Sequence, residues 1–130
     1  MAKRKSQPRR AVPAAFQIVR RLALALPDAE ESTSYGTPAF KVRGKLFARL
    51  HQDNESLVVR MDQRERAIRM QADQQTYHIT DHYTNYPWIL VRLASVSRDD
   101  LGELLKDAWQ LVAPARAASP RASAARRSKR

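Results

Sequence analysis

Both ends of this chain are strongly basic and carry no acidic residue, which limits the part that can fold to the segment between them. Residues 1–10 contain five Lys or Arg, and residues 114–130 contain six. Residues 11–113 hold the other 13 basic and all 13 acidic residues, so the net charge of +11 comes entirely from the ends. A neutral body with two cationic arms is typical of a domain held near a polyanion, most commonly nucleic acid. Arms that only keep the protein soluble are the alternative.

The body is large enough for one domain. We expect a basic tail over residues 1–12, a single domain over residues 13–113, and a second basic tail over residues 114–130, with both tails disordered. No apolar run approaches the roughly 18 residues that cross a bilayer, so no membrane association is expected. The absence of cysteine excludes disulfides, thiolate metal sites and a cysteine nucleophile, and it fits a cytoplasmic protein, which would be nucleoid-associated if it binds DNA.

The first half of the body reads as a helix followed by a meander of strands. A helix is predicted over residues 13–26, because its apolar residues recur at helical spacing and Pro27 cannot continue it. Strands are predicted at residues 39–42, 45–50 and 57–60, with Arg43-Gly44 as the first turn. The neighbouring carboxylates Glu30 and Glu31 are expected in a charged loop before the first strand.

The second half contains two further helices and two further strands. A short helix is predicted from Asp62 to Ala72, an extended segment at residues 76–80, and a central, nearly all-apolar strand at residues 88–93. Ser97 caps a last helix in which Gly102 is expected to permit close packing. The predicted apolar stripe of this helix consists of Leu101, Leu104, Leu105, Ala108, Leu111 and Val112.

This order of elements predicts the fold class. Hairpins interspersed with helices favour an α+β two-layer domain with a mostly antiparallel sheet of about five to six strands and three helices. The predicted order is one helix, three or four strands, a second helix, two strands and a third helix.

Three segments of the body resemble the MmcQ/YjbR family of small bacterial proteins. They are GTPAFKVRGKLFAR at residues 36–49, His82-Tyr83, and YPWILVRL at residues 86–93. The opening LPDAEE at residues 26–31 and the Leu- and Trp-bearing last helix also fit, so the resemblance covers roughly residues 15–115. It implies an α+β fold that has been likened to secretion chaperones. It also implies DNA binding, a label that rests on the likeness to a double-wing DNA-binding arrangement, and it carries no catalytic residue.

Catalysis and metal binding have little support in the residues themselves. His78 and His82 lie in a segment that reads as extended, where positions four apart are about 13 Å apart, too far for one zinc ion. No Gly-x-Ser-x-Gly motif and no Gly-rich phosphate loop is present. We expect neither an enzyme nor a bound metal or cofactor.

DNA is the expected partner, with RNA as the alternative, and it is bound with little sequence preference. The tails would attract phosphates, and Lys and Arg of the hairpin strands would position the body, unless these cations are only the ordinary wet face of the sheet. The candidate residues are Lys3, Arg4, Lys5, Arg9, Arg10, Lys41, Arg43, Lys45, Arg49, Arg60, Arg126, Arg127, Lys129 and Arg130.

Two other functions stay open at this stage. A chaperone-like domain could bind a protein partner, with the basic tails incidental. A small-molecule site could form at a pocket near His82, Tyr83, Tyr86 and Trp88. An exposed apolar patch would favour the first, and a deep aromatic pocket would favour the second.

Overall fold

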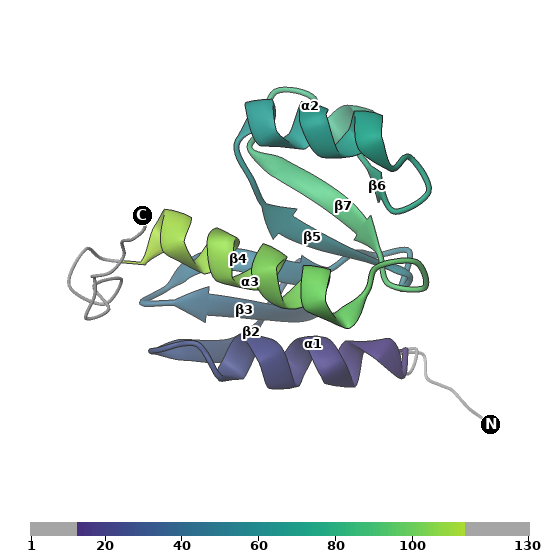
Figure 1. The fold of residues 1–130 in the computed structure, drawn as a ribbon. Helices are drawn as coiled ribbons and strands as arrows, with labels where there is room; N and C mark the ends of the chain where they lie inside the picture. The colour runs from purple at the N-terminus through teal and green to yellow at the C-terminus, as the bar shows by residue number, and fades with distance from the viewer. Residues whose placement is uncertain (1–12, 114–130) are drawn as a thin grey trace.

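The computed structural model describes residues 13–113, so the predictions for the two tails lie outside the described residues. Figure 1 shows the helices packed around a twisted sheet. The elements are α1 (Ala15–Leu24), β2 (Ala29–Ser34), β3 (Thr37–Val42), β4 (Lys45–Leu50), β5 (Ser56–Arg60), α2 (Gln63–Ala72), β6 (Tyr77–His78), η1 (Asp81–Tyr83), β7 (Trp88–Arg92) and α3 (Arg98–Val112). The predicted α+β class is therefore confirmed.

The six strands form one sheet in the order β2-β3-β4-β5-β7-β6, and every neighbouring pair is antiparallel. The middle of the sheet is β4 and β5, so the prediction that residues 88–93 form the central strand was wrong by one place. The prediction of a loop at Glu30 and Glu31 was also wrong, because both residues pair with β3 as part of β2. β2 is a polar edge strand, and it lacks the apolar alternation that reveals a half-buried strand.

Two tight turns build the first two hairpins. Tyr35-Gly36 joins β2 to β3 and Arg43-Gly44 joins β3 to β4, and all four residues have positive φ, between 51° and 82°. Two-residue hairpin loops of this type match the twist of the strands and favour Gly at the second position. Tyr35 and Arg43 carry side chains in a conformation that L-residues rarely adopt.

A β-bulge decides which side chains of β4 face the helices. The register shifts between Phe40, which opposes Ala48, and Lys41, which opposes Leu46, so Phe47 is the additional residue of β4. Phe47 and Ala48 both enter the main core as a result. The bulge also turns Arg49 to the opposite face of the sheet, whereas strict alternation would have placed it beside Phe47.

Helices α1 and α3 lie side by side over one face of the sheet and enclose the main core with it (Figure 1). The predicted stripe of α3 is confirmed at five positions, but Leu111 is 54% exposed. Trp109 is buried instead, and its indole N–H donates to the Pro27 carbonyl at 2.8 Å. Gly102 faces open space rather than a close neighbour, so the prediction of close packing there was wrong.

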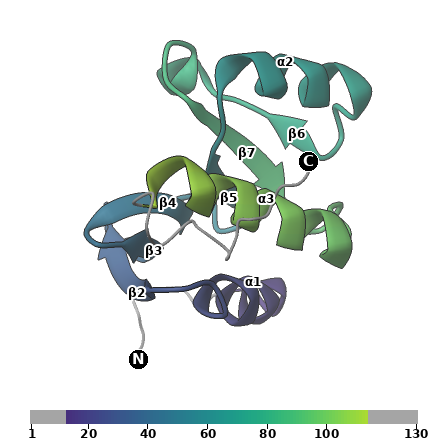
Figure 2. The same ribbon diagram turned by 60° about the vertical axis from the view of Figure 1, so that its left-hand side comes forward.

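The other face of the sheet has a smaller cluster, formed by Val58, Tyr83 and Leu90 with the half-buried Ile79 and Trp88 packed against it. Its cover comes from the segment between β6 and β7 rather than from α1 or α3. Figure 2 shows α1 and α3 on their own side of the sheet, with α2 beside β6 and β7. We call the side of the sheet that bears this smaller cluster the open face.

Candidate binding site on the open face

A pocket of about 340 Å³ lies on the open face. It is lined by Tyr35, Leu46, Arg49, Val58, His82, Tyr83, Tyr86 and Trp88. The structure therefore brings together the four predicted pocket residues. It adds Tyr35 from the β2–β3 turn and three residues of β4 and β5. A second hollow of about 270 Å³ shares Tyr35, Arg49, His82 and Tyr83 with the first.

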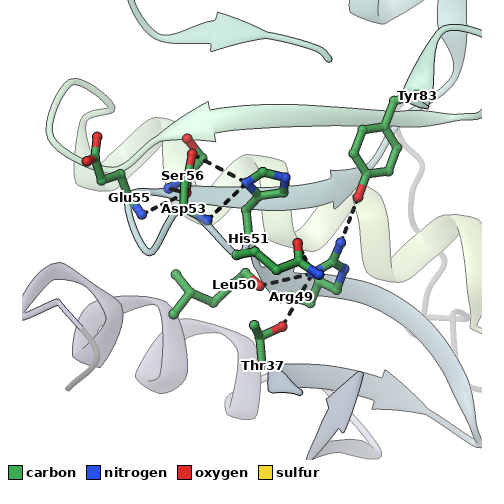
Figure 3. A network of polar contacts seen from close by, with 9 residues as sticks. Thr37, Arg49, Leu50, His51, Asp53, Glu55, Ser56 and Tyr83 are labelled. Atoms are coloured by element: carbon green, nitrogen blue, oxygen red, sulfur yellow. Dashed lines mark hydrogen bonds and ion pairs between the residues drawn. The ribbon is translucent and has the colours of Figure 1, made fainter. Parts of the chain in front are cut away.

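The side chain of Arg49 forms part of the wall of both hollows and is only 4% exposed. Its Nη2 donates to the Tyr83 hydroxyl at 2.7 Å (Figure 3). Its Nη1 donates to three neutral oxygens at longer distances of 3.2–3.4 Å: the Thr37 hydroxyl, the Leu50 carbonyl and the Gln52 side-chain amide. No carboxylate within residues 13–113 lies within ion-pair distance of this guanidinium. Arg49 is therefore a buried cation balanced by dipoles alone, an arrangement that is costly in a protein interior.

Tyr35 covers this guanidinium from the outside. The Arg49 guanidinium carbon lies 5.0 Å from the centre of the Tyr35 ring, which is a cation–π distance. Tyr35 is 78% exposed although it occupies a strained turn position with a φ of 55°. An exposed aromatic side chain in a strained conformation is typical of a functional position.

The rim of the pocket is aromatic. The rings of His82 and Tyr83 meet edge to face with centres 4.8 Å apart, and the ring of Tyr86 is tilted against His82 at 6.2 Å. Tyr86 is 55% exposed. On the far side, the Arg60 guanidinium lies 4.9 Å from the Trp88 ring, and its buried Nε has no hydrogen-bond partner among the described residues.

Arg66 of α2 holds the segment that carries these aromatic residues. Its Nη1 donates to the carbonyls of Tyr83, Tyr86 and Trp88 at 2.7–3.0 Å, and its Nη2 donates to that of Thr84 at 2.9 Å. Arg66 is 7% exposed and is the one buried residue of α2. α2 begins at the N-cap Asp62, whose carboxylate accepts from the Glu65 N–H at 2.9 Å. The helix thus contributes to the pocket through one guanidinium rather than through an apolar face.

A polar turn at the β4–β5 connection borders the second hollow (Figure 3). Asp53 Oδ1 accepts hydrogen bonds from the backbone N–H groups of Glu55 and Ser56 at 2.8 and 2.9 Å. His51 Nδ1 lies 3.4 Å from Asp53 Oδ2. Burial raises the pKa of the Asp53 carboxyl, but these backbone hydrogen bonds outweigh burial and hold the pKa below its usual value.

His78 also faces the open side, since it opposes Leu90 in the register. Burial, together with the nearby charge of Arg92, lowers the pKa of its imidazole. Its buried Nδ1 has no hydrogen-bond partner in the part of the chain that the structure describes. His78 is therefore a half-buried side chain that lines neither hollow, and it does not join His82 in one site.

The predicted nucleic-acid candidates of the body separate into two groups. Lys41, Arg49 and Arg60 lie on the open face. The prediction that Arg49 lies along a phosphate backbone was wrong, because its side chain is buried. Arg43 is in a turn and pairs with Asp28 at 3.6 Å, and the register places Lys45 beside the core residue Val42. The candidates in the tails lie outside the described residues: Lys3, Arg4, Lys5, Arg9, Arg10, Arg126, Arg127, Lys129 and Arg130.

One functional candidate, Arg92, was missed from the sequence, and Tyr35 was not assigned to the pocket. Arg92 opposes Ser56 on the open face, and it donates to the Gln74 and Gln75 carbonyls at 3.1 and 2.9 Å. The alternation of Trp88, Leu90 and Arg92 along β7 was the available signal. Tyr35 carried a weaker signal, an aromatic residue directly before a turn glycine, and its contact with Arg49 depends on the bulge in β4.

No cluster of three or more His, Asp or Glu side chains that could hold a metal ion is present among residues 13–113. None of the helices in this range is long and apolar enough to span a bilayer.

Comparison with known proteins confirms the resemblance noted in the motifs. The family model described as YjbR matches residues 24–111. The crystal structure of Deinococcus radiodurans protein DR2400, a protein with a DUF419 domain, is similar with a TM-score of 0.62 and 27% identity, over 72% of this chain and 75% of that chain. The uncharacterized proteins Mb2600 of Mycobacterium bovis and Rv2570 of Mycobacterium tuberculosis are 47% identical over 38 residues, which are 29% of this chain. That match spans only 30% of the length of these two relatives.

Proposed function

Because this chain belongs to the YjbR family, whose model matches residues 24–111, we propose that it is a DNA-binding protein of low sequence specificity. The basic ends supply attraction to phosphates, and the open face positions the body on the nucleic acid. The protein acts by binding and is not an enzyme.

The observation that carries this proposal is the uneven distribution of charge over a body that is neutral as a whole. The open face bears the half-buried cations Lys41, Arg60 and Arg92, and the one acidic strand residue whose register places it there is Glu30, opposite Lys41. On the opposite side, α1 and α3 together contain four acidic residues and four basic ones, so their charges balance. Within residues 13–113, Arg60 and Arg92 have no carboxylate within ion-pair distance. Unneutralised cations beside exposed aromatic rings are what sequence-tolerant nucleic-acid surfaces use.

The tails add eleven cations. Each phosphate that is neutralised releases counterions, and the slope of log K against log salt becomes steeper by about 0.9 per contact on duplex DNA. The tails and the open face therefore predict a strongly salt-dependent affinity in which the two contributions can be separated.

The test is a salt titration of duplex DNA binding with the full chain and three variants. The first variant carries Gln at all eleven tail cations, the second carries Lys41→Gln with Arg60→Gln, and the third carries Arg98→Gln with Lys106→Gln on the exposed surface of α3. The second and third variants lose the same charge from opposite sides of the body. We expect the tail variant to show a slope shallower by about 0.9 for each lost phosphate contact. We also expect the open-face variant to bind more weakly than the α3 variant.

Equal weakening by the open-face and α3 variants would show that the sheet is not the positioning surface. If the full chain does not bind duplex DNA at about 50 mM salt, where such contacts are strong, the DNA proposal fails. The protein-interaction alternative would then lead. On the described helices, the exposed large hydrophobic residues available to it are Leu24, Ile68 and Leu111, one on each helix.

A further inference from the structure

We propose that the pocket on the open face is a site for a small anion that carries a planar ring, with Arg49 as the receptor for the acidic group. This inference does not depend on DNA binding, because it rests on the lining of the pocket. The class includes a nucleoside monophosphate, either free or as one unit of a single strand, and an aromatic carboxylate.

The charge of the lining determines the sign of the ligand. Among the residues that line the two hollows, Arg49 is the one permanent charge, and none is Asp or Glu. A buried guanidinium without a counter-charge gains most from an acidic ligand, because charge-assisted hydrogen bonds are shorter and about twice as strong as neutral ones. The bonds from Nη1 to neutral oxygens, at 3.2–3.4 Å, are long enough to be replaced by such contacts.

Tyr83 supplies a second polar group beside this cation. Its hydroxyl oxygen accepts the 2.7 Å bond from Arg49 Nη2, so its own proton is left to donate. An oxyanion next to both groups would accept from the guanidinium and from the hydroxyl. Arg66 fixes the Tyr83 backbone through its carbonyl at 2.9 Å, which holds this donor in place before a ligand arrives.

The rings on the rim determine the shape of the rest of the ligand. Tyr35 and Tyr86 are 78% and 55% exposed at the pocket, although aromatic side chains of this size are usually covered. A planar ring stacked against them would be enclosed on its faces while its acidic group points toward Arg49. The volume of about 340 Å³ is at the lower end of the range for ligand pockets, and the adjoining hollow of about 270 Å³ is just below that range, which suits one ring system with its acidic group.

The test titrates the full chain with four probes and follows the backbone amide resonances of Tyr35, Arg49 and Tyr83. The probes are adenosine 5′-monophosphate and indole-3-carboxylate, which combine a ring with an acid, and adenosine and inorganic phosphate, which each offer one of the two. We expect at least one of the combined probes to bind about 10- to 100-fold more tightly than adenosine or phosphate, the effect of one or two charge-assisted hydrogen bonds. Failure of both combined probes to bind, or equal binding of neutral adenosine, overturns the proposal.

Two substitutions assign the site. Arg49→Met should abolish binding of the combined probes, and its circular dichroism shows whether the sheet is intact. Tyr35→Asn removes the ring but suits the positive φ of the turn, so it should weaken binding about 5- to 10-fold without unfolding the hairpin. The matched control is Arg43→Asn, which makes the same change at the other two-residue turn, away from the pocket. If Arg43→Asn weakens binding as much as Tyr35→Asn, the probes do not bind in this pocket.

A last arm separates the two sources of a nucleotide. Unlabelled oligothymidylate that displaces adenosine 5′-monophosphate with the stoichiometry of one pocket would identify the natural source as a strand, and no displacement would identify it as the free small molecule. Loss of duplex binding by the tail variant leaves these titrations unaffected, so the two proposals fail separately.

Discussion

Replacing Arg66 by Met tests the idea that one buried guanidinium holds the wall of the pocket. Met keeps most of the length and apolar volume of the Arg side chain, so the substitution removes the hydrogen bonds with little loss of packing. The four bonds to the carbonyls of the 83–88 segment measure 2.7–3.0 Å. A hydrogen bond from a charged donor contributes about 1.5–3 kcal/mol, and a carbonyl left without a partner in the interior costs about 1–3 kcal/mol.

The total loss of stability for Arg66→Met is smaller than four times the cost of one unsatisfied carbonyl, because water can reach some of the released carbonyls. Thr84 and Tyr86 are exposed, whereas Tyr83 is buried and Trp88 is half-buried. Counting two carbonyls as unsatisfied gives an expected loss of about 3–5 kcal/mol in the free energy of unfolding. For a domain of this size, whose whole stability is on the order of 5–15 kcal/mol, such a loss is severe.

The assay is urea unfolding followed by far-UV circular dichroism, with the backbone amide resonance of Tyr83 as a local probe of the pocket. Arg64→Met on the same helix is the matched control, because Arg64 is exposed and its loss should change stability by less than about 0.5 kcal/mol. Arg66→Lys keeps the charge but not the planar fork, and it should fall between the wild type and Arg66→Met. A loss below about 1 kcal/mol for Arg66→Met, or one equal to that of Arg64→Met, would refute the reasoning.

Three further predictions concern stability. Leu105→Ala should lower the free energy of unfolding in urea by about 2–5 kcal/mol, because Leu105 is fully buried in the main core. Leu111→Ala, at a 54% exposed position of the same helix, should lower it by less than about 1 kcal/mol. Similar losses for the two substitutions would mean that a different side of α3 faces the core. Arg43→Asn should raise the free energy of unfolding by about 0.5–1 kcal/mol, because Asn tolerates the positive φ of this turn better than Arg does. Tyr35→Asn should leave the free energy of unfolding nearly unchanged, because the same relief is offset by the lost contact with Arg49. Equal gains for the two substitutions would show that the contact between Tyr35 and Arg49 contributes nothing to stability. Because the pKa of Asp53 is lower in the folded protein than in the unfolded chain, its carboxylate stabilises the fold above the unfolded pKa, and this stabilisation is lost as the pH falls through the folded pKa. Asp53→Asn should therefore be less stable than the wild type near pH 7, and the difference should shrink in acid. Thermal unfolding of both proteins across about pH 2–7 measures this difference.

Most of the fold could be predicted from the sequence because its signals are local. The two Gly-containing turns, the N-caps Asp62 and Ser97, and the apolar periodicity of α1 and α3 each specify an element without reference to the rest of the chain. β2 could not be found this way, because its polar residues become a strand only by pairing with β3. The choice of Leu111 over Trp109 for the stripe of α3 failed for a related reason, since the Trp109 indole is held by a carbonyl 82 positions earlier in the chain.

The candidate site was predictable only in part. His82, Tyr83, Tyr86 and Trp88 lie close together in sequence, so their proximity in space was a short step. Arg49 belongs to the same pocket through a bulge, and a regular strand would have directed it toward the helices. The apolar residues Phe47 and Leu50 cannot share one face of a regular strand, and this conflict was the available sign of the irregularity.

The position of β2 has a consequence for self-association. A strand at the border of a sheet offers unpaired backbone groups to any other extended chain, and natural sheets discourage such additions with charge and polar side chains. β2 carries Glu30 and Glu31 among exposed Ser and Thr residues, and at the opposite border β6 is only two residues long. Substituting Val for Glu30 and Thr33 would convert β2 into an apolar template, and it should shift the protein toward soluble oligomers or aggregates at concentrations where the parent chain does not form them.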